Sequence, residues 1–302
     1  MVPHQEDRPS ASGVSVAFWL NLLFSIIEVY GGLLTNSTAI LADAFHDFMD
    51  TAAIGLAVLL DKISNKKRTL RFSYGYKRFS LLAALGLSVF LLIGAVLMAV
   101  SGVKSWLNPE VVDSLGMLWL AVLGIGINGF AFLRIKNGNG SHHTHGHSHN
   151  HNHQAIMLHL LEDVLGWVAV LVGAGVIYYT GWYWIDGVLT LAIATFIGYN
   201  ATKNLTSVLK VLLQSVPENV NLEQLSAELT TLEGVENIHD LHVWSLDGNY
   251  HVGSLHAVIG TSHQHSENSI YASIRQVMEK HHIQHPTVQL ETTDISCQWV
   301  SC

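Results

Sequence analysis

The stretch Ile40–Asp50 reads ILADAFHDFMD and lies in one of the most apolar parts of the chain. It nevertheless carries Asp43, His46, Asp47 and Asp50 within eight residues. On a helix, His46 and Asp50 share one face, one turn apart, Asp43 lies on roughly the same face, and Asp47 is rotated away. Ionisable groups inside a membrane span are costly and mark functional sites. The stretch therefore predicts a membrane helix with an ion-binding role.

The composition favours a membrane protein. Of 302 residues, 49% are hydrophobic and only 13% are charged, whereas soluble domains carry about 25% charged residues. The net charge of -8 argues against a nucleic-acid partner, for which a basic surface is expected. Two cysteines, Cys297 and Cys302, offer no disulfide framework. The polar first ten residues predict no cleavable signal peptide.

Six segments are long and apolar enough to be expected to span a membrane as helices. They are Val14–Leu34, Thr38–Leu60, Phe79–Gly102, Asp113–Leu133, Ala155–Tyr179 and Tyr183–Thr202. After Leu213, charges become frequent and no apolar run is long enough to span. We therefore predict a short tail (1–13), an all-α transmembrane domain (14–213) and a soluble domain (214–302).

Basic residues predict the orientation, because loops rich in Lys and Arg stay in the cytoplasm. The loop after the second span reads DKISNKKRTLRFSYGYKR, and further basic residues follow the fourth and sixth spans. The connections on the opposite side contain a single basic residue, Lys104. Both termini, and with them the tail and the soluble domain, are expected in the cytoplasm. A bacterial inner membrane is the simplest location.

A histidine-rich segment, residues 137–153, joins the fourth and fifth spans and is expected to be a flexible cytoplasmic loop. Its sequence is NGNGSHHTHGHSHNHNH, without helical or strand periodicity. Imidazoles on a flexible chain collect metal ions at low affinity; an unselected polar tract is the other interpretation. The histidines concerned are His142, His143, His145, His147, His149, His151 and His153.

The soluble domain has the signals of a small αββαβ unit. Residues 221–232 and 267–282 have helical apolar periods. IHDLHVWSL and YHVGSLHAVIG are predicted strands joined by a hairpin at Asp247-Gly248-Asn249, and PTVQLETT is a third. Strand alternation places His242 and Trp244 on one face of the first strand and Leu241 and Val243 on the other.

A second H-x-x-x-D motif lies in the fifth span, where LHLLEDVLG contains His159 and Asp163. Facing His46 and Asp50, it would complete a set of two imidazoles and two carboxylates, which suits tetrahedral Zn²⁺. Asp43 and Glu28 are candidate accessory residues, although Glu28 is equally compatible with a structural pair. Asp186 is expected to mark the start of the sixth span.

These features together resemble the cation diffusion facilitator family, and its zinc-transporting members in particular. The resemblance rests on NSTAILADAFHDFMD, the paired motifs, the six spans, the histidine-rich loop, FSYGYKRFSLLAAL and HDLHVWSL, and it extends from about Ser15 to Thr292. It implies a homodimeric Zn²⁺/H⁺ antiporter, not an enzyme, embedded in membrane lipid. The soluble domain would have a ferredoxin-like, dimerising fold that binds regulatory metal through His239, His256, His285 and Glu291.

Antiport also follows from the ligand chemistry, since metal and protons compete for neutral His and ionised Asp. Two other classes remain open. A membrane metalloenzyme would need histidine ligands on ordered helices, whereas this histidine tract is interleaved with Gly, Ser and Asn. A passive metal channel or sensor would need weaker binding than a deep four-ligand site provides.

Overall fold

The computed structural model describes residues 11–64, 66, 68–137, 149–260 and 266–292. Along parts of the helices, including His159, only the backbone is described. The chain forms two compact units. The first comprises residues 1–58 and 86–203, and the second comprises residues 59–85 and 204–302.

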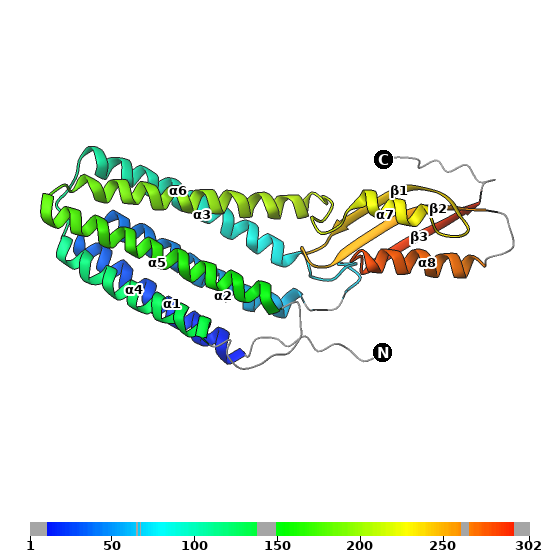
Figure 1. The fold of residues 1–302 in the computed structure, drawn as a ribbon, viewed down its shortest axis with the longest axis horizontal. Coiled ribbons are helices and arrows are strands. Elements are labelled where there is room, and N and C mark those ends of the chain that lie inside the picture. The colour runs from blue at the N-terminus through cyan, green and yellow to red at the C-terminus, as the bar shows by residue number, and fades with distance from the viewer. Residues whose placement is uncertain (1–10, 65, 67, 138–148, 261–265, 293–302) are drawn as a thin grey trace. The chain divides into compact units, whose positions relative to one another are not determined.

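Six long helices occur where the spans were expected and run alongside one another (Figure 1). Their bounds are α1 Ala11–Thr35, α2 Thr38–Ser64, α3 Phe79–Leu107, α4 Ser114–Asn137, α5 His149–Thr180 and α6 Trp184–Leu212. Most extend beyond the apolar core because polar residues continue the helix at its ends. The last three histidines of the expected loop lie in the first turns of α5 for this reason, and residues 138–148 lie outside the described residues.

Four helices among the described residues are long and apolar enough to cross a membrane. They are α3, α4 over Ser114–Leu133, α5 over Leu160–Thr180, and α6. The two others are helical but less uniformly apolar. The described apolar part of α1 is the shorter Asn21–Thr35, and α2 carries Asp43, Asp47 and Asp50.

The core of the first unit forms around Trp167 of α5, which is 1% exposed. Phe24 of α1 packs against its ring with centroids 6.0 Å apart, and Ile40 of α2 and Met117 of α4 belong to the same cluster. Gly124 of α4 leaves room for the indole, since a Cβ there would lie 2.4 Å from Trp167 Cδ2. This cluster joins α1, α2, α4 and α5, which include both helices with H-x-x-x-D motifs.

The second unit contains a three-stranded sheet covered on one face by two helices (Figure 1). The elements are α7 Leu222–Thr230, β1 Val235–Ser245, β2 His251–Ile259, α8 Glu267–Lys280 and β3 His285–Thr292, the expected αββαβ order. The strand order is β1-β2-β3; β1 pairs antiparallel and β3 parallel with β2.

Side chains from both helices and alternate strand positions form the core of the second unit. Ile270, Ile274, Val277 and Met278 make the buried stripe of α8, at the spacing of an amphipathic helix. They pack with residues such as Leu255 of β2. The neighbouring β2 positions therefore point to the helix-free face of the sheet.

Candidate metal sites

The α2 half of the expected membrane site has the geometry that its spacing predicts. His46 Nε2 lies 3.7 Å from Asp50 Oδ2, and both side chains are roughly one-fifth exposed. Asp43 points towards α5, because its Oδ1 would lie 3.9 Å from a Cβ placed on Gly166. The ionisable residues of α2 thus approach the helix that carries the second motif.

The α5 half is described in part. His159 lies in α5, but its side chain is outside the described atoms. Asp163 is half-buried one turn later and interacts electrostatically with Asp43. The described side chains therefore bring Asp163 near the acidic face of α2, while the four-ligand set as a whole stays a prediction.

Two further carboxylates gather beside this region. Glu28 of α1 is fully buried, and Asp47 of α2 is 6% exposed. Glu28 interacts electrostatically with Asp47, Asp43 and Asp163. Asp47, which is rotated away from the His46 face, is therefore turned towards α1 rather than towards lipid. Carboxyl groups this close together cannot all stay ionised without a cation beside them, so this region can take up cations or protons.

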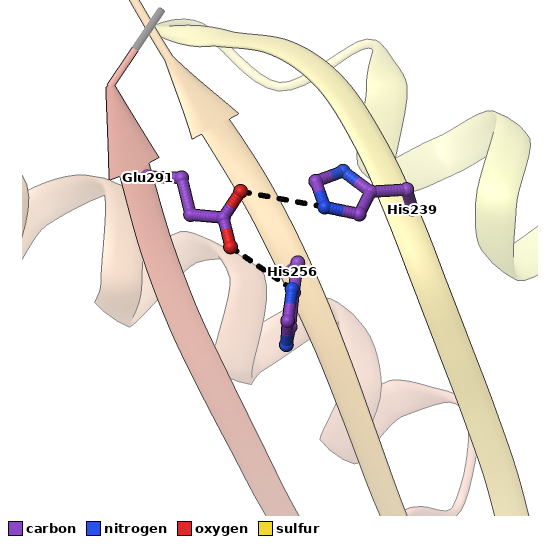
Figure 2. A group of neighbouring side chains, drawn as sticks. All are labelled: His239, His256 and Glu291. Atoms are coloured by element: carbon purple, nitrogen blue, oxygen red, sulfur yellow. Dashed lines mark ion pairs between the residues drawn. The ribbon is translucent and has the colours of Figure 1, made fainter. Parts of the chain in front are cut away.

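In the second unit, His239, His256 and Glu291 lie together on the helix-free face; we call these three residues the sheet triad (Figure 2). One ligand atom from each lies within 4.8 Å of the others. Glu291 Oε2 is 3.3 Å from His239 Nε2, and Glu291 Oε1 is 2.9 Å from His256 Nδ1. Two imidazoles and a carboxylate are ligands that zinc and other divalent transition metals accept.

The register of the sheet assembles the triad from three strands. His239 lies opposite His256, and Glu291 lies opposite Val258, which shares the face of His256. A β-bulge in β1 falls between His239 and His242, with Asp240 at φ 52°. Because of the extra residue, His239 and His242 both face the helix-free side, although strict alternation over three residues would separate them.

Asp240 and His242 extend the cluster, and they were not among the candidate ligands from the sequence. His242 Nε2 lies 2.8 Å from Asp240 Oδ1, and His256 Nε2 lies 3.8 Å from Asp240 Oδ2. The hydrogen bond with His242, followed by the charges of the nearby histidines, lowers the pKa of Asp240. His256 thus has a carboxylate beside each ring nitrogen.

Gln289 also belongs to this region. It lies opposite His256 in the sheet and donates from Nε2 to Glu291 Oε1 over 2.9 Å. The signal in the sequence was its position two residues before Glu291, which places both side chains on one face of a strand.

His285 does not join the triad, contrary to the expected ligand set. It opens β3 opposite Val252, and its ring meets the edge of Tyr74 at a centroid distance of 5.9 Å. Six residues of extended chain separate it from Glu291, which corresponds to about 20 Å. The two residues are close in sequence, but the strand carries His285 away from the cluster.

The fold is that of a helical membrane protein, and each of its two units brings together side chains of the types that can bind metal. The cation efflux transmembrane domain model matches residues 14–213, and the cation efflux protein cytoplasmic domain model matches residues 217–293. The chain belongs to the cation efflux family, which confirms the resemblance found in its sequence motifs.

Two transporters similar to most of the chain agree with this assignment. The "Cadmium, cobalt and zinc/H(+)-K(+) antiporter" of Bacillus subtilis is 31% identical over 282 residues, covering 92% of this chain and 88% of the relative. "Zinc transporter ZitB" of Yersinia pseudotuberculosis is 32% identical over 278 residues, covering 91% and 86%. A solved metal-bound C-terminal domain of the CzcD transporter from Cuprividus metallidurans is 29% identical, covers 24% of this chain and 99% of that chain, and has a TM-score of 0.22.

Proposed function

We propose that this protein exports divalent metal cations, with Zn²⁺ as the principal substrate, in exchange for protons. The observation that carries the proposal is the His46–Asp50 pair, one turn apart in a helix that packs among apolar spans. The relatives support the substrate class, since both are named for zinc, and the Bacillus subtilis relative is also named for cadmium, cobalt and antiport with protons and potassium. Cadmium and cobalt are therefore the first competing substrates to compare.

The transport site in this proposal consists of His46 and Asp50 of α2 with His159 and Asp163 of α5. Two neutral imidazoles and two carboxylates satisfy a tetrahedral dication and balance its charge, which a low-dielectric interior requires. Asp43, Glu28 and the adjacent Asp47 are accessory carboxyl groups that can take up protons or help to balance the charge of the cation. The proximity of Asp43 and Asp163 supports this placement.

Proton coupling follows from the same ligands. His46 and His159 must be neutral, and Asp50 and Asp163 ionised, to hold the metal. Protonation of these groups lowers metal affinity, so acidic conditions on the release side favour discharge of the metal. Return of the protonated site to the cytoplasmic side, where the protons dissociate, then completes an exchange of cation for protons.

We further propose that all six long helices span the membrane, with both termini in the cytoplasm. The polar residues of α2 face its neighbours rather than lipid, which is how spans tolerate such residues. The basic residues at the end of α2 and in the following loop, which include Lys62, Lys66 and Arg68, support the orientation. A bacterial inner (plasma) membrane fits the relatives, which come from bacteria.

The second unit is proposed to be a ferredoxin-like, dimerising domain that senses cytoplasmic metal at the sheet triad. The match of residues 217–293 to the cytoplasmic domain of cation efflux proteins supports this proposal. Metal bound on the helix-free face would favour one state of the protein over another, which is the requirement for feedback by a ligand. Residues 138–148 of the histidine-rich loop and the tail with Cys297 and Cys302 lie outside the described residues, so metal collection by the loop stays a prediction from the sequence.

Proton-coupled flux in proteoliposomes tests the proposal. We expect Zn²⁺ uptake to follow an imposed pH gradient, and His46→Ala and Asp163→Ala to abolish both zinc flux and zinc-driven proton flux. Glu162→Gln is the matched control, because Glu162 is exposed on α5 beside Asp163, and it should retain wild-type flux. Zinc flux that does not depend on the pH gradient would indicate a channel. Unchanged flux in a variant that combines His46→Ala and Asp163→Ala would refute the proposed site. Comparison of Zn²⁺ with Cd²⁺, Co²⁺, Ni²⁺, Fe²⁺ and Mn²⁺ sets the selectivity.

A further inference from the structure

Asp186 lies in the first turn of α6, and its side chain reaches the start of α2. Its side chain is 0% exposed. Its carboxylate accepts four hydrogen bonds from residues at the start of α2. Thr38 N and Thr38 Oγ1 donate to Oδ2 over 2.8 Å each, Ser37 Oγ donates to Oδ1 over 2.5 Å, and Ala39 N approaches Oδ1 at 3.3 Å.

These bonds solve a problem specific to a buried helix start. The first four backbone N–H groups of a helix lack partners within it, and at this start water cannot replace them, because Ser37, Ala39 and Ile40 are 0% exposed. Asp186 accepts from Thr38 N and Ala39 N, Ser37 Oγ accepts from Ile40 N, and Ser37 N donates to Gly32 O of α1. All four donors are thereby satisfied, two of them by the side chain of Asp186.

The same turn of α6 is joined to α3. A Cβ on Gly187 would lie 2.4 Å from Trp106 N and 2.8 Å from Gly102 O, so the backbones of α6 and α3 are in direct contact there. Thr190, one turn after Asp186, has its Oγ1 2.6 Å from Thr38 Oγ1. The N-terminus of α2 is therefore bonded to α6 at the point where α6 packs against α3.

We propose that Asp186 is a positioning residue for the metal ligands of α2: by fixing the start of α2 to α6, it sets the position of His46 and Asp50. The inference rests on the proposed function, because it requires metal to bind these two residues. His46 lies eight residues beyond Thr38, or about 12 Å along the helix. A tilt of about 5° at the anchor moves a ligand at that distance by about 1 Å, whereas functional sites need placement to about 0.5 Å.

The test is the metal dependence of transport by Asp186→Asn in the full-length protein. Asparagine keeps the shape but presents an amide N–H₂ to two donors of α2 where the wild type presents an acceptor. We expect the zinc concentration for half-maximal transport to rise roughly tenfold, as when groups that orient metal ligands are removed. Zinc affinity of the purified protein, measured by calorimetry, should fall by the same factor, while the maximal rate per folded molecule changes less.

A residue that only stabilises the fold gives a different pattern. It would reduce the amount of folded protein and the total rate, and leave the half-maximal zinc concentration unchanged; that result overturns the inference. Thr195→Val is the matched control, because the Thr195 hydroxyl donates to Leu191 O within α6. It should leave both quantities at their wild-type values.

A milder variant decides the question if Asp186→Asn does not fold. Thr38→Val removes the hydroxyl bonds but keeps the backbone bond from Thr38 N, so a two- to threefold rise in half-maximal zinc concentration is expected, and no rise refutes the inference. Failure of the proposed function is separate: it appears as metal transport that persists in His46→Ala. If His46→Ala is inactive but Asp186→Asn has the wild-type half-maximal zinc concentration, only the positioning role is rejected.

Discussion

Replacing Glu291 with Gln tests the sheet triad while nearly preserving its shape. In the wild type, the carboxylate lies 3.3 Å from His239 Nε2 and 2.9 Å from His256 Nδ1, and it is almost fully buried. The glutamine carbonyl still accepts from one imidazole, and the other ring can present its unprotonated nitrogen to the amide. The metal-free protein should lose only about 1 kcal/mol, the net worth of one hydrogen bond.

Metal binding should suffer much more, because the variant removes the only anionic member of the triad. We expect affinity to fall at least about a hundredfold, at or beyond the upper range for loss of a partner that only orients ligands. At a zinc concentration one hundred times the wild-type Kd, binding stabilises the wild type by about 2.7 kcal/mol. With the Kd raised a hundredfold, the same zinc gives about 0.4 kcal/mol, roughly one-sixth as much.

The assay is thermal unfolding of the full-length protein in detergent, with and without chelator-buffered zinc. The background carries Asp50→Ala and Asp163→Ala, so that the proposed transport site does not contribute. Glu228→Gln is the control, since Glu228 accepts hydrogen bonds from Lys280 and His281 in the same unit. It should lower stability without altering the zinc-induced rise. An equal rise in wild type and Glu291→Gln would refute the reasoning about the triad.

Three further predictions concern packing, pH and the histidine-rich loop. Gly187→Ala should cost about 1–3 kcal/mol in thermal unfolding because its Cβ overlaps the α3 backbone, whereas Gly175→Ala, with open space around the new Cβ, should be neutral or slightly stabilising; equal effects would contradict the close contact. Burial lowers the pKa of His251, despite the opposing charge of Asp247 and with a smaller contribution from His282. The unfolded chain therefore binds the proton more readily, so stability is fully present above about pH 6.5 and declines as pH falls towards the folded-state pKa. His251→Gln should flatten this decline in metal-free unfolding experiments, and an unchanged slope would assign it to other groups. Deleting residues 142–153 should leave transport at saturating zinc intact and lower uptake at low zinc; loss at saturating zinc would give the loop a structural or catalytic role.

The helices and the α2 half-site follow from local sequence. A period of 3.6 residues is enough to place His46 and Asp50 together, and the 3.7 Å separation of their polar atoms agrees with it. The αββαβ order likewise follows from apolar periods and the Asp247-Gly248-Asn249 turn. These features depend on residues within one or two turns of each other, so no long-range pairing is needed to predict them.

The sheet triad was decided by tertiary structure. Simple alternation from Leu241 and Val243 would turn His239 towards the helices, and only the bulge at Asp240 returns it to the face of His256. The parallel register of β3 then selects Glu291 and leaves His285 beside Tyr74. The family resemblance named all three members of the triad together with His285, and strand register determined which of these four expected ligands lie together.

Asp186 marks the same division most clearly. From its sequence position it marks the start of a helix; in the fold it completes the hydrogen bonding of α2, which begins 148 residues earlier in the chain. The sequence by itself determined which segments are helices, which faces carry ionisable groups and which family the chain resembles, because these depend on spacing along the chain. Tertiary structure alone decided which charged groups meet across helices and strands, because that depends on register and packing between segments far apart in sequence.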